Sequence, residues 1–269
     1  MKNKSILFCL VFCVKNKTFL FIFASTKKHI MVISTQIKEK VAQAESGIIL
    51  TIRDFDIEPQ YQAALVKALN RMAATGELKK ASKGKYYKPK NTQFGTLKPT
   101  ITETIKEFLE KDGEITGYIT GTAAFASMGL TTQITSAVTI GTNKYRRPMT
   151  RGEYRVTFLP QPNPISKEDI PLLRILDAIR LIKEIPAITP DEAILTLNKI
   201  ISSQPTNKIE HLTSLAERYS PCVRALLGAI LENSGLPTYN LQLKLNGVTY
   251  YKMPVSNNTL PNKRNWNII

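Results

Sequence analysis

The apolar positions between Met31 and Pro89 switch between helical and strand spacing. They predict a helix, a short strand, a brief helix, a longer helix and the two strands of a hairpin, in that order: Gln36–Glu45, Ile48–Leu50, Ile52–Asp56, Pro59–Gly76, Leu78–Ala81 and Tyr86–Lys88. One face of the longer helix is apolar and is expected to pack on the first two helices: Tyr61, Leu65, Ala68, Leu69 and Met72. This order of elements predicts a winged helix-turn-helix over residues 31–90.

A polar stretch over residues 91–99, with Gly95 and Pro99, is interpreted as a linker. Beyond it the pattern predicts the helix Thr102–Lys111, the helix Gly121–Met128 and the strands Ala137–Thr142 and Tyr154–Leu159. Four further helices follow at Glu168–Ile185, Asp191–Ser202, Lys208–Tyr219 and Pro221–Asn233.

Asn246-Gly247 lies between alternating apolar residues, so Leu241–Leu245 and Val248–Lys252 are predicted to form a hairpin. The fold class is therefore α+β: an N-terminal winged helix-turn-helix followed by a C-terminal α+β domain, residues 100–255, with an antiparallel sheet and several helices. Residues 256–269 are expected to form a loose polar tail, with Trp266 as a candidate for docking.

The first thirty residues differ from the rest. Two apolar runs, Ser5–Val14 and Phe19–Ala24, are split by Lys15-Asn16-Lys17. Each is too short for a bilayer core of about 30 Å, which needs roughly 20 apolar residues. We favour a start assigned too early, with translation beginning at Met31; a signal peptide or membrane anchor is the alternative.

The chain carries a net charge of +16 over 269 residues, with a pI near 9.7. Such an excess favours nucleic acid, an anionic membrane surface or an acidic protein as partner. The three cysteines form neither a disulfide framework nor a zinc-binding pattern, which indicates a reducing, cytoplasmic compartment. No membrane association is expected unless residues 1–30 are retained, and no cofactor is expected.

The exposed side of the longer helix is small and polar, and the hairpin after it is loaded with lysine. Small residues permit close approach to DNA, while amide and cationic groups reach base edges and phosphates. An ordinary surface helix and a solvated charge run are the competing interpretations. The predicted DNA contacts are Gln60, Lys67, Asn70, Arg71, Lys79, Lys80, Lys83, Lys85 and Lys88.

A second basic cluster lies in the loop or hairpin between the two predicted strands: Lys144, Arg146, Arg147, Arg151 and Arg155. Arginine favours bidentate recognition of phosphate or carboxylate. Three interpretations remain open: a second DNA contact, a docking site for an acidic protein, and a soluble loop.

Catalytic signals are weak. Asp112, Glu114, Glu153 and Asp177 are scattered without metal-ligand spacing, and no nucleophile lies beside a base. His211 and Cys222 are expected to be surface or packed residues. The sequence thus predicts a protein that is not an enzyme and has no metal site.

Three motifs resemble the AbiEi-type antitoxins of bacterial type IV toxin–antitoxin systems, first described in abortive phage infection. They are the hairpin Lys83-Gly84-Lys85-Tyr86-Tyr87-x-Pro89, the pair Gly117-Tyr118-Ile119-Thr120-Gly121 and Gly129-Leu130-Thr131-Thr132-Gln133, and Thr142-Asn143-x-x-Arg146-Arg147. The resemblance covers about Met31 to Trp266, but the N-terminal extension has no counterpart and the helices after Glu168 match less closely.

The resemblance implies a winged helix that binds operator repeats in double-stranded DNA and represses its own operon. It also implies a second domain that counteracts a nucleotidyltransferase-like toxin, functionally and without the need for a stable complex. The predicted DNA contacts above carry over by position, and no catalytic residue does. A winged-helix regulator without an antitoxin role, a DNA-directed nuclease or nucleotide-modifying enzyme, and a membrane-tethered regulator are the alternatives.

Overall fold

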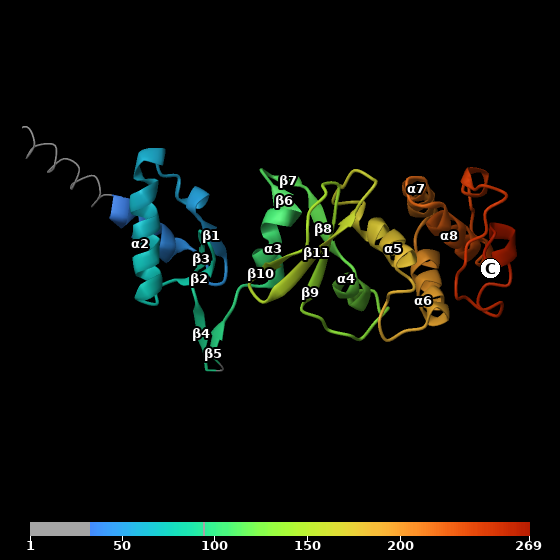
Figure 1. Ribbon diagram of the computed structural model, residues 1–269, viewed down its shortest axis with the longest axis horizontal. Coiled ribbons are helices and arrows are strands. Elements are labelled where there is room, and N and C mark those ends of the chain that lie inside the picture. Colours follow the sequence, from blue (N-terminus) through green and yellow to red (C-terminus); the bar gives the residue numbers. More distant parts are fainter. Residues whose placement is uncertain (1–32, 94) are drawn as a thin grey trace, which may run out of the picture. The chain divides into compact units, whose positions relative to one another are not determined.

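The computed structural model describes residues 33–93 and 95–269 (Figure 1). The chain divides into two compact units, unit 1 ending at Thr104 and unit 2 spanning Ile105–Ile269. The predictions made for residues 1–30 lie outside the described residues. Together the two units contain helices and several small sheets, so the α+β class is confirmed.

Unit 1 begins with a helix over residues 33–43 and contains one three-stranded sheet and the helix α2. All strand pairs in this sheet are antiparallel and the order is β1-β3-β2. The elements are β1 (Ile49–Thr51), the 3-10 helices η1 (Ile52–Phe55) and η2 (Pro59–Tyr61), α2 (Gln62–Ala74), β2 (Lys79–Ser82) and β3 (Lys85–Tyr87).

The bounds of α2 follow from its sequence. Pro59 begins η2, the 3-10 turn that leads directly into α2, because its ring fixes φ and a first-turn N–H has no helical partner. Gly76, at φ +84°, lets the chain leave the helix in the left-handed region. The predicted apolar face is confirmed: Leu65, Leu69 and Met72 are buried, and Tyr61 and Ala68 pack against the same cluster. The predicted brief helix is η1, a single 3-10 turn.

The β2–β3 hairpin turns at Lys83-Gly84, where Gly84 has φ +73°. Tyr86 and Tyr87, which follow each other in β3, are both buried. Successive residues of a strand point to opposite faces, so both faces of β3 are covered.

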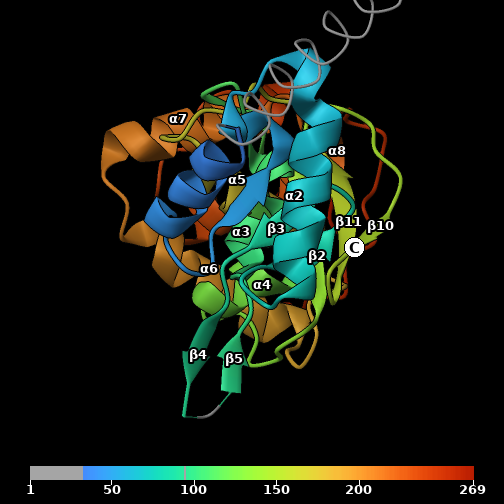
Figure 2. The ribbon, with the colours of Figure 1, turned by 90° about the vertical axis from the view of Figure 1, so that its left-hand side faces the viewer.

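The predicted linker is a second hairpin. Strands β4 (Lys90–Thr92) and β5 (Gly95–Leu97) pair antiparallel and project away from α2 and the three-stranded sheet (Figures 1 and 2). Threonine side chains brace it: Thr92 Oγ1 donates to the carbonyl of Gly95, and Thr96 Oγ1 donates to Asn91 Oδ1. Polar composition suggested a linker, but threonine favours strands and Gly95, at φ +114°, provides the turn.

Unit 2 is built around a four-stranded sheet of order β10-β11-β9-β8. Its strands are β8 (Gly117–Thr120), β9 (Ala137–Thr142), β10 (Met149–Arg151) and β11 (Tyr154–Pro160). The prediction of an antiparallel sheet is wrong in part, because β9 and β11 run parallel while the other pairs are antiparallel. β9 and β11 run parallel because an additional strand, β10, forms within the predicted basic loop between them. It pairs with the edge of β11 that faces away from β9.

Helices cover both faces of this sheet (Figure 1). Phe108 of α3 (Ile101–Leu109) meets Phe158 of β11 edge to face, with ring centroids 5.4 Å apart. On the opposite face Tyr118 and Thr120 of β8 reach α5 (Ile170–Arg180). A short hairpin, β6 (Glu110–Lys111) and β7 (Glu114–Ile115), joins α3 to β8, and α4 (Thr122–Ser127) follows β8.

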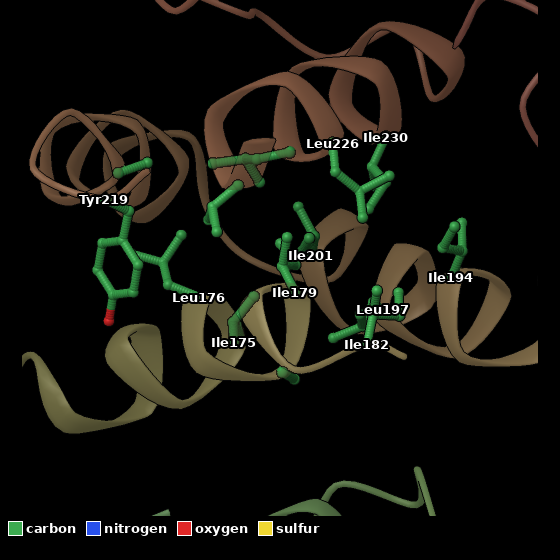
Figure 3. Packing of buried hydrophobic residues seen from close by; sticks show 14 of the residues in the cluster. Ile175, Leu176, Ile179, Ile182, Ile194, Leu197, Ile201, Tyr219, Leu226 and Ile230 are labelled. Atoms are coloured by element: carbon green, nitrogen blue, oxygen red, sulfur yellow. The ribbon is translucent and has the colours of Figure 1, made fainter. Parts of the chain in front are cut away.

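The four predicted C-terminal helices are present, and only the last has both of its predicted ends. The first is shorter, as α5, and the third is shifted, as α7 (Thr206–Ala216). The other two are α6 (Pro190–Ser202) and α8 (Pro221–Asn233). Their apolar faces meet in one core, in which Ile179 of α5, Ile201 of α6 and Leu226 of α8 lie together (Figure 3).

The predicted C-terminal hairpin is absent. Gln242–Lys244 forms the 3-10 helix η3, and Leu243 and Val248 are both 83% exposed. Asn246 Oδ1 accepts a hydrogen bond from the amide of Val248, so the asparagine closes a local turn of its own. Tyr251 instead forms a parallel bridge with Ile268.

The predicted loose tail packs on α8. Trp266, in the 3-10 helix η4 (Lys263–Trp266), is 1% exposed, so its docking is confirmed. Its ring occupies the space above Gly228, where a Cβ would lie 2.1 Å from Cζ3. Trp266 Nε1 also donates to Glu232 Oε2, 2.8 Å away. The tail is polar in composition, but the packing of Trp266 on Gly228 holds it against α8.

Candidate nucleic-acid interface

The exposed side of α2 carries Lys67 and Asn70, one turn apart. Tyr86 of β3, itself buried, donates a hydrogen bond of 2.8 Å from its hydroxyl to Asn70 Oδ1. This bond ties α2 to the hairpin. It also orients the Asn70 amide, whose oxygen is occupied by Tyr86 and whose NH₂ group is the remaining donor.

The hairpin next to α2 is strongly basic. Lys79, Lys80 and Lys83 are exposed, and between Glu77 and Glu103 the sequence has seven lysines and no acidic residue. Lys80 lies opposite Tyr86 in the ladder. Residues directly opposite each other point to the same face, so Lys80 lies on the side of the sheet that carries α2. Lys67, Asn70 and Lys80 thus belong to one side of unit 1.

Other predicted contacts have partners within the protein. Gln60 Nε2 donates to Glu58 Oε2, 2.6 Å away. Lys88 Nζ donates to the carbonyl of Ala42, 3.0 Å away, near the end of the first helix, where a cation complements the helix dipole. Lys85 is half-buried.

Arg71 is exposed on α2 and lines a cavity of about 240 Å³ together with Lys38 of the first helix and Glu77. That cavity lies between the first helix and α2. Arg71 therefore belongs to the flank of α2 that meets the first helix.

Removing the Tyr86 hydroxyl tests the link between α2 and the hairpin. We expect Tyr86→Phe to lower the free energy of unfolding by about 1 kcal/mol, the usual net value of one hydrogen bond. Urea denaturation of Tyr86→Phe, Asn70→Ala and the double variant measures the coupling. The two single effects should not add, since each change removes the same bond. Additive effects would mean that the two side chains act independently.

The second basic cluster splits into two groups. The guanidinium of Arg146 lies 5.2 Å from the ring centroid of Phe108 and 5.9 Å from that of Phe158. Arg151 lies 5.3 Å from Phe108, and its Nε is 2.8 Å from Glu107 Oε1. These two arginines hold α3 against the sheet through cation–π contacts and an ion pair. The other members, Lys144, Arg147 and Arg155, are exposed.

A buried polar network crosses unit 2, and sequence reasoning missed it. Asp177 of α5 is 0% exposed. Its Oδ2 accepts from Tyr118 Oη at 2.7 Å and Thr120 Oγ1 at 2.8 Å, and its Oδ1 accepts from Tyr219 Oη at 3.0 Å. Gln161 Nε2 donates to both tyrosine hydroxyls, at 2.6 and 2.7 Å. Figure 3 shows Tyr219 pointing toward α5.

Burial sets the protonation of this network. It raises the pKa of Asp177, although hydrogen bonds from Tyr118, Thr120 and Tyr219 act in the opposite direction. Burial and the nearby Asp177 also raise the pKa of Tyr118 and Tyr219. Both phenols therefore keep their protons and act as donors. With every oxygen of Asp177 occupied by side-chain donors, the arrangement fixes β8 and the α7–α8 junction to α5.

The motifs that carry the family resemblance supply much of this framework. Tyr118 and Thr120 come from the first glycine motif, and the ring of Tyr118 lies where a Cβ on Gly141 would stand, 2.5 Å from Cζ. Asn143 Nδ2 donates to the carbonyls of Gln161 and Asn163, at 2.7 and 2.6 Å. In this motif Tyr118 and Thr120 lie two residues apart, so both point to the same face of β8. Two hydroxyl groups on one face of a strand could have indicated a buried acceptor opposite them, which the structure identifies as Asp177.

Residues considered for catalysis lie apart. His211 Nε2 is 2.6 Å from Asp169 Oδ1 at the surface. Cys222 is half-buried, its Sγ donates to Met253 Sδ, and burial raises the pKa of its thiol. Over residues 33–93 and 95–269 no three His, Cys, Asp or Glu side chains gather as metal ligands would. Within the same ranges no helix has the length and apolar character to cross a bilayer.

The fold and these surfaces define an α+β protein with a lysine-rich first unit and a second unit built on a mixed sheet. The chain belongs to a family of unknown function (DUF6088), which it matches over residues 36–202. The match ends with α6, so Tyr219 and Trp266 lie beyond it. Comparison with curated proteins finds no match.

Among solved structures, the crystal structure of the Rv2827c protein from Mycobacterium tuberculosis is similar to this chain. The identity is 14%, the TM-score is 0.45, and the alignment covers 81% of this chain and 82% of that chain.

Proposed function

We propose that residues 31–90 form a winged helix-turn-helix that binds double-stranded DNA. The observation that carries this proposal is the pairing of α2 with the basic β2–β3 hairpin through Tyr86 and Asn70. The order of elements and the sheet order β1-β3-β2 support it, because the strand before α2 pairs with the returning strand of the hairpin. Lys67 and Asn70 would approach the bases, and Lys79, Lys80 and Lys83 the phosphates.

The family resemblance extends the proposal to an autorepressing antitoxin of the type IV class, located in the cytoplasm. In this proposal unit 1 binds operator repeats upstream of the chain's own gene. Unit 2 counteracts a nucleotidyltransferase-like toxin without a requirement for a stable complex. The protein acts without enzymatic chemistry or a cofactor. A winged-helix regulator with no toxin to counteract is the alternative.

The double variant Lys80→Ala/Lys83→Ala, which removes two exposed lysines of the hairpin, tests DNA binding. Each phosphate contact releases counterions, so two lost contacts should lower the slope of log K against log salt by about 1.8. Affinity for a duplex containing the chain's own upstream region should fall at least about tenfold at 0.1 M salt. Fluorescence anisotropy over a salt series measures both quantities.

The control is Lys167→Ala/Lys199→Ala, which removes the same charge from exposed positions of unit 2. Equal binding by the two double variants would show that only net charge matters and would refute the proposed wing.

The antitoxin role is tested by co-expression with a nucleotidyltransferase encoded beside this gene. The double variant of the hairpin lysines should still protect cells from this toxin. If the unaltered chain does not protect them, the antitoxin role fails and the protein is a regulator only.

A further inference from the structure

The loop between β9 and β10 presents an aromatic ring to solvent. Tyr145 is 85% exposed, and its neighbours Lys144 and Arg147 are exposed as well. No acidic residue lies between Thr142 and Gly152 in the sequence. A tyrosine bracketed by cations is typical of surfaces that bind nucleic acid, since the ring offers a stacking face and the cations bind phosphate.

This loop is held on both sides of the ring. On one side the Asn143 amide donates to two carbonyls, those of Gln161 and Asn163. On the other side Arg146 lies over the rings of Phe108 and Phe158. Tyr145 therefore occupies a short span between two anchored residues. Binding to such a span loses less conformational entropy than binding to a free loop.

We propose that this loop binds unpaired nucleotides of a single-stranded nucleic acid. One base stacks on Tyr145, and Lys144 and Arg147 contact the flanking phosphates. A duplex does not fit this role, because its bases are already stacked on one another and expose no face. An acidic protein would use the cations alone and leave the tyrosine without a function. The proposal concerns unit 2 and does not depend on duplex binding by unit 1.

The experiment uses the full chain with Lys80→Ala/Lys83→Ala, so that the lysine hairpin contributes little. Anisotropy measures the affinity for labelled U20, dT20, a 20-nucleotide abasic strand and a 20-bp duplex. We expect U20 or dT20 to bind more tightly than the abasic strand and the duplex. The stronger of the two identifies RNA or DNA as the source of the unpaired nucleotides. Equal binding to the abasic strand would overturn the proposal.

Adding Tyr145→Ala should weaken binding to the preferred strand about tenfold and leave binding to the abasic strand unchanged. Tyr145→Trp should restore the affinity. Lys144→Ala/Arg147→Ala should reduce the salt slope by about 1.4, whereas Tyr145→Ala should not change it. The matched control is Tyr250→Ala, which removes another exposed tyrosine of unit 2. If Tyr145→Ala binds as Tyr250→Ala does, the ring takes no part and the proposal fails.

These results separate the two proposals. Loss of duplex binding in the lysine-hairpin variant, with single-strand binding retained, supports both. If the unaltered chain does not bind the upstream duplex but Tyr145 still governs single-strand binding, the winged-helix proposal fails alone. If no single strand binds in any background, the loop is a soluble connection and the inference from Tyr145 is wrong.

Discussion

Trp266→Ala is expected to lower the free energy of unfolding of unit 2 by about 4 kcal/mol, within the range for large-to-small changes at buried aromatic residues. The indole is 1% exposed and fills the space above Gly228. Its removal leaves a cavity on α8 and deprives Glu232 of a hydrogen-bond donor. It also releases the segment whose residue Ile268 bridges Tyr251.

Urea denaturation followed by far-UV circular dichroism measures this loss, because Trp266 is the only tryptophan of the chain and its fluorescence disappears in the variant. Trp266→Phe should cost less, since most of the apolar contact remains. Gly228→Ala should also destabilise unit 2, because the new Cβ would overlap the indole at 2.1 Å from Cζ3. A Trp266→Ala variant with the midpoint of the unaltered chain would show that the tail does not dock.

The sequence predicted the elements that depend on local periodicity. Leu65, Leu69 and Met72 recur once per turn of α2, and the structure buries all three. The proline that begins α8 and the glycine shortly after its end, Gly235, predicted both of its bounds correctly, at Pro221 and Asn233. These features depend only on residues within a few positions of one another, so a single segment contains the whole signal.

Features that depend on distant partners were not predictable in this way. Asn246-Gly247 had the pattern of a hairpin, but an Asx-type turn at Asn246 and the pairing of Tyr251 with Ile268 took precedence. The parallel pair β9 and β11 depends on where β10 lies, which periodicity does not encode.

The candidate sites show the same division. The lysines of the hairpin were evident from composition. That Arg146 and Arg151 pack on Phe108 required the fold, because α3 is more than thirty residues away along the chain. Two members of an apparent charge cluster are therefore structural, and only the structure separates them from Lys144 and Arg147.

Asp177→Ala is the second change with a large expected effect. It should lower the free energy of unfolding by about 3 kcal/mol or more, because three buried hydroxyl groups lose their acceptor and each unsatisfied group costs about 1–3 kcal/mol. Asp169→Ala is the matched control at the N-cap of the same helix, where a partly exposed ion pair with His211 should contribute under about 1 kcal/mol. Equal costs for the two variants would show that the network does not stabilise unit 2.

The pH dependence of Asp177→Asn tests the charge in this network. Burial raises the pKa of Asp177 above its unfolded value, so the folded state holds the proton more tightly. The stability from the protonated carboxyl is then fully present below the unfolded pKa, about 3.9, and is lost as pH rises through the folded value. The unaltered chain should therefore lose stability relative to Asp177→Asn as pH rises from about 4.

Taking the difference between the two proteins at each pH removes the titration of every other group, because both chains share those groups. Urea midpoints between pH 4 and 8 supply that difference, with Asp169→Ala measured alongside. Asp169 should behave in the opposite sense: although burial raises its pKa, hydrogen bonds from His211 and Ser166 hold it below the usual range. Its contribution is therefore lost as pH falls. If the unaltered chain gained stability over Asp177→Asn with rising pH, the three hydroxyl donors would outweigh burial and Asp177 would be held as a carboxylate.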